Sequence, residues 1–89
     1  MTHYFALLQG IYIFREHDVG DEMYFIREGS VAVFAQGGDH TVATLESGAF
    51  FGEMALFVEN GRRQNSIMAD TQTELYSLTR SDLIHLLGG

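Results

Sequence analysis

The sequence predicts an all-β domain, an antiparallel sandwich or barrel, on the strength of two observations. Turn-forming Gly, Asp and Ser residues recur at short intervals, and the runs between them are brief and rich in β-branched and aromatic residues. A chain of 89 residues is enough for one domain, so residues 1–89 are predicted to form a single unit with a small core. The predicted strands are Ile11–Phe14, Met23–Arg27, Val31–Ala35, Thr41–Leu45, Ser66–Ala69 and Glu74–Leu78.

The ends and the first hairpin follow from local patterns. The opening segment, Met1–Leu8, is apolar and fits either a strand or a helix. Gly37-Gly38-Asp39 separates Val31–Phe34 from His40–Leu45, which predicts a β-hairpin. Phe50 and Phe51 are expected in the core.

Two short segments have helical character instead. Gly52–Leu56 follows a turn and contains good helix formers, which predicts one helical turn. Thr79–Asp82 resembles a capping box, and the leucines and isoleucine after it predict a short C-terminal helix that ends at Gly88-Gly89.

Composition excludes several classes of protein. The net charge is −7, with twelve acids, five arginines and no lysine, so binding of DNA or RNA by this segment is not expected. There is no Cys for a disulfide or a thiolate metal site. No apolar run is long enough to span a bilayer, so no membrane insertion is expected. The default location is cytoplasmic, or the cytoplasmic side of a membrane protein.

The stretch from Phe50 to Ser66 has the chemistry of an anion site. Backbone N–H groups near Gly52 and a guanidinium from the Arg62-Arg63 pair are the donors that a phosphate prefers. Glu53 would repel a phosphate, so its presence favours a ligand that also offers sugar hydroxyls. The stretch therefore predicts a site for a phosphorylated sugar. On composition alone, the alternative that both arginines are solvated surface residues stays open.

Motifs along nearly the whole chain resemble one family. The segments are Gly20–Ile26, Glu28–Val33, Gly48–Leu56, Arg63 and Ala69–Leu78. Together they are similar to the cyclic-nucleotide-binding domains of bacterial catabolite activator proteins, of kinase regulatory subunits and of cyclic-nucleotide-gated channels. The resemblance implies an eight-stranded β-roll of the jelly-roll type (a double-stranded β-helix). It also implies a phosphate-binding cassette, with its short helix, between the sixth and seventh strands.

The resemblance assigns a role to each cassette residue. Gly52 would let the backbone approach the ligand, and Glu53 would accept a hydrogen bond from the ribose 2′-hydroxyl. Met54 and Ala55 would supply backbone donors. Arg63 would pair with the cyclic phosphate. The implied ligand is cyclic AMP or cyclic GMP.

The residues after Arg63 depart from the family pattern of two small residues and then Ser or Thr. Gln64 and Asn65 are bulkier amides, which either crowd the phosphate or donate extra hydrogen bonds to it. Ser66 occupies the hydroxyl position, which in the family touches the phosphate or the base. All three are predicted to belong to the ligand site.

The resemblance also implies neighbours for this domain. Family members carry a C-terminal lid helix and helices before the roll, whereas this chain ends after one short helix, so we expect a fragment or a minimal domain. The effector domain would then lie in the same chain or in another chain. Apolar surface left without those helices makes a homodimer a hypothesis. The residues expected on that surface are Phe5, Leu7, Leu8, Leu86 and Leu87.

The predicted function is a regulatory module that binds a ligand and has no chemistry of its own. One alternative is a non-binding member of the same fold that acts as a structural or interaction module. Another is a metal enzyme of the cupin type, but the four histidines stand apart and lack the H-x-H spacing of such sites. Neither a metal nor a cofactor is therefore expected.

Overall fold

A computed structural model describes residues 2–58 and 61–88 and contains eight strands and two short helices. The elements are β1 (His3–Leu7), β2 (Tyr12–Phe14), β3 (Glu22–Glu28), β4 (Ser30–Phe34), β5 (Thr41–Glu46), β6 (Phe50–Phe51), the 3₁₀ helix η1 (Glu53–Leu56), β7 (Ile67–Ala69), β8 (Thr73–Thr79) and α1 (Arg80–Leu86). Met1 and Gly89, to which two predictions extend, lie outside the described residues.

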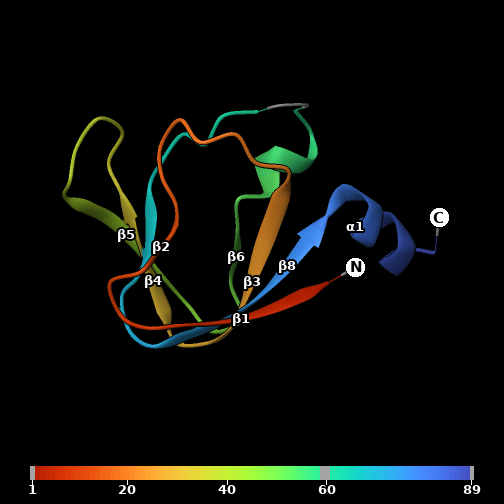
Figure 1. The fold of residues 1–89 in the computed structure, drawn as a ribbon, viewed down its shortest axis with the longest axis horizontal. Helices are drawn as coiled ribbons and strands as arrows, with labels where there is room; N and C mark the ends of the chain where they lie inside the picture. The colour runs from red at the N-terminus through yellow and green to blue at the C-terminus, as the bar shows by residue number, and fades with distance from the viewer. Residues whose placement is uncertain (1, 59–60, 89) are drawn as a thin grey trace.

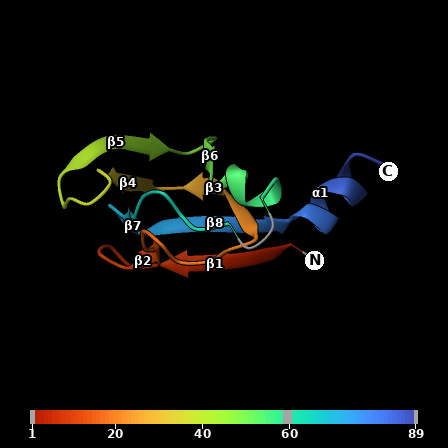
Figure 2. The same cartoon turned by 90° about the horizontal axis from the view of Figure 1, so that it is seen from above.

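The strands form two four-stranded antiparallel sheets (Figures 1 and 2). One sheet has the order β1-β8-β3-β6 and the other β2-β7-β4-β5, so the chain crosses repeatedly between them. This is the jelly-roll type of β-roll, and the predicted fold class is confirmed. The helix η1 stands between β6 and β7, where the resemblance places the cassette.

The core lies between the sheets and consists of Ile26, Val31, Phe51, Ile67 and Leu75. These side chains alternate with outward-facing residues along their strands, because successive strand residues point to opposite faces. The same rule corrects one prediction. Phe51 is 4% exposed, but its neighbour Phe50 is 57% exposed and faces outward.

All six predicted strands agree with the structure to within one residue at each end. The ambiguous opening segment forms β1, which pairs with β8 from His3↔Ser77 to Leu7↔Thr73. The predicted hairpin is the β4–β5 pair. Strand β6 was not predicted, because two residues are too few to show a period.

The C-terminal helix begins with the predicted capping box. The Thr79 hydroxyl accepts a hydrogen bond from the Asp82 N–H at 3.1 Å, and the Asp82 carboxylate accepts one from the Thr79 N–H at 3.0 Å. Each bond satisfies a backbone donor that the first turn of a helix leaves unpaired.

Thr79→Ala should therefore destabilise the domain by about 1 kcal/mol. For a domain of this size, the melting temperature should fall by roughly 4–8 °C. Thr79→Ser keeps the hydroxyl and serves as the control, which should melt close to the wild type. Equal melting of all three proteins would show that the cap contributes nothing.

The apolar surface agrees with expectation at four of five positions. Phe5, Leu8, Leu86 and Leu87 are exposed, whereas Leu7 packs against the core. In the described part of the chain, no helix is both long enough and apolar enough to cross a membrane.

Candidate functional site

A pocket of about 350 Å³ opens beside η1, within the size range of small-ligand sites. Its walls come from η1, from the segment that leads into β7, and from Phe14 at the end of β2. The pocket brings together seven of the eight predicted site residues, and Ser66 is outside its lining. The lining residues are Phe14, Gly52, Glu53, Met54, Ala55, Val58, Gly61, Arg62, Arg63, Gln64, Asn65 and Ile67.

Arg63 is buried at this pocket, with only 8% of its surface exposed. Its Nη1 donates to the Gly52 carbonyl oxygen at 3.1 Å, and its Nη2 donates to the Glu22 carbonyl oxygen at 2.7 Å. The guanidinium carbon lies 4.2 Å from the centre of the Phe14 ring, a cation–π distance. The side chain is thus held by two carbonyl groups and one aromatic face.

Two glycines make room for this guanidinium. A Cβ atom on Gly20 would stand 2.5 Å from Nη2 and 2.6 Å from Nε of Arg63, and one on Gly52 would stand 2.9 Å from Nη1. Gly52 also has φ of 76°, a left-handed conformation that favours glycine. Both positions therefore need glycine for the arginine to sit where it does.

The acids that act on the charge of Arg63, namely Glu22, Asp21 and Asp18, do so without forming an ion pair with it. Among the described residues no carboxylate lies within 4.0 Å of its nitrogens, since the described ion pairs join Glu16 to His17 and Arg27 to Glu74. Its Nε is buried and has no described hydrogen-bond partner. Burial lowers the pKa of Arg63, because desolvation disfavours the charged form. The arginine is still a cation at neutral pH, so the pocket lining holds a positive charge that has no ion-pair partner among the described residues.

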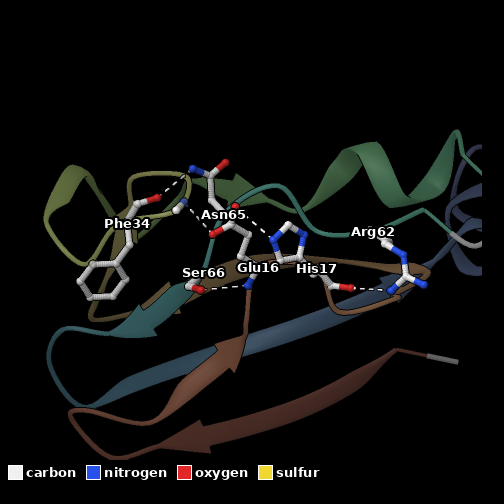
Figure 3. Close-up of polar contacts among 7 residues, drawn as sticks. Glu16, His17, Phe34, Arg62, Asn65 and Ser66 are labelled. Carbon is white, nitrogen blue, oxygen red and sulfur yellow. Dashed lines mark hydrogen bonds and ion pairs between the residues drawn. The ribbon is translucent and has the colours of Figure 1, made fainter.

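The backbone of Arg63 is fixed by the loop after β2. The His17 N–H donates to the Arg63 carbonyl oxygen at 2.8 Å, and the Arg63 N–H donates to the Asp18 carbonyl oxygen at 2.7 Å. Arg62 adds a bond from Nη1 to the His17 carbonyl oxygen at 2.9 Å (Figure 3). His17 has φ of 76°, a strained conformation for a residue other than glycine.

Asn65 and Ser66 join the end of the cassette to neighbouring segments (Figure 3). The Asn65 amide nitrogen donates to the Phe34 carbonyl oxygen at 2.8 Å, and the Ser66 hydroxyl accepts from the Glu16 N–H at 2.9 Å. Both side chains thus have structural partners in β4 and in the loop after β2. Gln64 is exposed and lines the pocket.

The first turn of η1 contains three of the predicted site residues, Glu53, Met54 and Ala55. Glu53 is half-buried and lines the pocket, as does the exposed Met54. The Ala55 N–H already donates to the Gly52 carbonyl oxygen at 3.2 Å, so it serves the helix itself. The backbone N–H groups of Glu53 and Met54 have no partner among the described residues, as expected for the start of a helix.

Three residues that hold Arg63 were missed in the sequence: Phe14, Gly20 and Glu22, of which Glu22 acts through its backbone carbonyl oxygen. Phe14 supplies the aromatic face, but its pattern is that of any core residue in a strand. Gly20 belongs to a motif that carries the family resemblance, yet nothing in the sequence connects it with Arg63 across more than forty residues. In the described segments, no three His, Asp or Glu side chains cluster closely enough to hold a metal ion.

The fold is a β-roll, and its pocket beside η1 has the buried guanidinium of Arg63 in its lining. The chain belongs to the cyclic nucleotide-binding domain family, whose model matches residues 5–88.

Similar proteins agree with this assignment. The human potassium/sodium hyperpolarization-activated cyclic nucleotide-gated channel 4 is 46% identical over 70 residues, which are 79% of this chain and 6% of the channel. The mouse cyclic nucleotide-gated channel alpha-4 is 36% identical over 88% of this chain and 14% of its own length. The crystal structure of the Thermus thermophilus catabolite activator protein superposes with a TM-score of 0.85 at 36% identity, over 98% of this chain and 42% of that one. The chain therefore spans only a small part of its channel relatives.

Proposed function

We propose that this domain binds a 3′,5′-cyclic nucleotide, cyclic AMP or cyclic GMP, in the pocket beside η1. Binding would be passed to an effector domain in the same chain or in another chain. The domain would act by binding alone, without catalysis and without a metal. A cytoplasmic location, or the cytoplasmic side of a membrane protein, goes with this role.

The observation that carries the proposal is the buried guanidinium of Arg63, which forms no ion pair with any described residue. Two of its five N–H groups are used by carbonyl oxygens, and the buried Nε has no described partner. Taking a cation out of water costs several kcal/mol unless a partner restores the lost interactions. A phosphate monoanion has the charge and the acceptor oxygens to do so.

Glu53 favours a ligand that carries hydroxyl groups as well as a phosphate. A carboxylate in the lining of an anion pocket needs hydrogen-bond donors from the ligand, and ribose hydroxyls supply them without adding charge. The backbone N–H groups of Glu53 and Met54, which have no partner among the described residues, are in the same turn as this carboxylate. A cyclic nucleotide combines the phosphate and the hydroxyl in one rigid group.

The alternative is a non-binding member of the family whose pocket is closed by Gln64 and Asn65. Two observations favour binding. The Asn65 amide is held by the Phe34 carbonyl oxygen, and a pocket of about 350 Å³ coexists with both side chains. The bulkier amides are therefore compatible with a ligand.

Ligand-dependent melting tests the proposal. A ligand at one hundred times its dissociation constant stabilises the folded state by about 2.7 kcal/mol. For a domain of this size, the melting temperature should then rise by at least about 10 °C with millimolar cyclic AMP or cyclic GMP.

The control ligand is 5′-AMP, which has the same base and sugar as cyclic AMP but an open 5′-phosphate in place of the 3′,5′-cyclic phosphate. It should shift the melting temperature much less than the preferred cyclic nucleotide. No shift with either cyclic nucleotide would favour the non-binding alternative, and an equal shift with 5′-AMP would remove the preference for a cyclic ligand.

A further inference from the structure

We propose that two copies of this chain pair edge to edge along β1, which extends the sheet β1-β8-β3-β6 across a two-fold axis. This contact would use the β1 edge of the sheet, and no residue of β1 lines the pocket beside η1. The partner is a second copy of the chain, in a defined register.

Strand β1 is an open sheet edge. It pairs with β8 on one side, and no other described segment forms backbone hydrogen bonds with His3–Leu7. Figure 2 shows β1 at the margin of the molecule, with β8 on its inner side. Tyr4 and Phe5 are 52% and 40% exposed. Native proteins usually protect such an edge with charges, proline or a bulge, and β1 has none of these.

The charge distribution favours a second copy as the partner. Each chain has a net charge of −7, so two copies repel each other, and the repulsion is weakest where the contacting surfaces carry no charge. The longest stretch without an acid or an arginine is residues 1–14, which contains β1. On the adjacent strand β8, Glu74 is neutralised by an ion pair at 2.9 Å with Arg27 of β3.

The side chains of β1 are also self-complementary. Antiparallel pairing about Phe5 uses all five residues of the strand and sets Tyr4 of one copy opposite Ala6 of the other, twice by symmetry. Tyr4 and Ala6 share the outer face of the sheet, so each large ring would meet a small side chain.

Tyr4 is also preorganised for this contact. Its ring lies 5.7 Å from that of Tyr76, and its hydroxyl donates to Glu74 at 2.5 Å. Register places Tyr4, Tyr76, Phe25 and Phe50 in one row across the four strands of the sheet. Pairing at β1 would cover the open end of this aromatic row.

A single engineered cysteine tests the register, because the chain has none of its own. Directly opposite residues in an antiparallel pair have Cα atoms about 4.5–5.5 Å apart, which suits a disulfide. Phe5→Cys should therefore give a disulfide-linked dimer under mild oxidation, read on a non-reducing gel. Thr44→Cys, on the exposed edge strand β5, is the control and should remain mostly monomeric. Equal cross-linking of the two variants would overturn the proposal.

A charge at the edge tests the association without a covalent bond. Sedimentation of the wild-type chain over a concentration series should show a monomer–dimer equilibrium that strengthens with added salt, since salt screens the repulsion. Ala6→Lys should weaken the dimer about tenfold, because it puts an ammonium group against Tyr4 of the second copy. Ala43→Lys makes the same change on β5 and should have little effect. A wild-type monomer at millimolar concentration, or equal effects of the two lysines, would contradict the proposal.

Discussion

Arg63→Ala is expected to weaken the binding of cyclic AMP by about 2–3 kcal/mol, roughly 30- to 150-fold in the dissociation constant. Arg63 is the buried cation of the pocket, and its loss leaves the ligand phosphate without a charged donor. Isothermal titration calorimetry of the variant and the wild type measures the difference. If cyclic GMP binds the wild type more tightly than cyclic AMP, the same comparison is made with cyclic GMP.

Arg62→Ala is the matched control, because it removes the same side chain from the adjacent residue. Arg62 is exposed and its guanidinium bonds the His17 carbonyl oxygen, so the loss of affinity should be much smaller. Arg63→Lys keeps the charge but lacks the fork of donors, and should bind with intermediate affinity. If the alanine variants bind equally, Arg63 is not the phosphate partner.

Gly20→Ala is expected to weaken binding by about tenfold, although Gly20 itself lies outside the pocket lining. The new methyl group would stand 2.5 Å from the Arg63 Nη2, so the guanidinium has to leave its place between Gly20 and Gly52. It would then lose its bonds to the Glu22 and Gly52 carbonyl oxygens. Calorimetry gives the affinity, and thermal melting gives the cost to the fold.

Gly38→Ala separates this effect from a general intolerance of alanine. Gly38 lies in the loop between β4 and β5, and a Cβ there would meet its nearest neighbour at 3.5 Å, an ordinary contact. That variant should bind as the wild type does. If Gly20→Ala also binds normally, then the described position of Arg63 is not needed for the ligand.

Much of the fold could be predicted from the sequence, because the strands are short, regular and separated by turn residues. The capping box of α1 and the turn of η1 also follow from local chemistry. The exposure of Phe50 could not be predicted, since alternation along a strand puts only one of two adjacent phenylalanines in the core and the sequence does not show which one. The opening segment fitted either a strand or a helix, and its pairing with β8, which makes it a strand, is not visible in the local sequence.

The site was less predictable than the fold. The pocket contains Gly52, Glu53 and Arg63, because these residues lie close together in one segment. The way Arg63 is held depends on Phe14, Gly20 and Glu22, which the fold brings in from the other end of the chain. The partners of Asn65 and Ser66 are distant in the same way, in β4 and in the loop after β2. Contacts of this kind leave no trace in local spacing.

The central claim is that Arg63 and the start of η1 hold a cyclic phosphate. The most direct measurement follows the Nε–H resonance of Arg63 and the backbone amides of Glu53 and Met54 by NMR during titration with cyclic AMP and cyclic GMP. We predict that all three signals move together and saturate at one ligand per chain, with the Nε–H of Arg63, which has no partner among the described residues, among the largest changes. Saturable binding that leaves the Arg63 and η1 signals unmoved would place the ligand elsewhere and contradict the proposed role of Arg63.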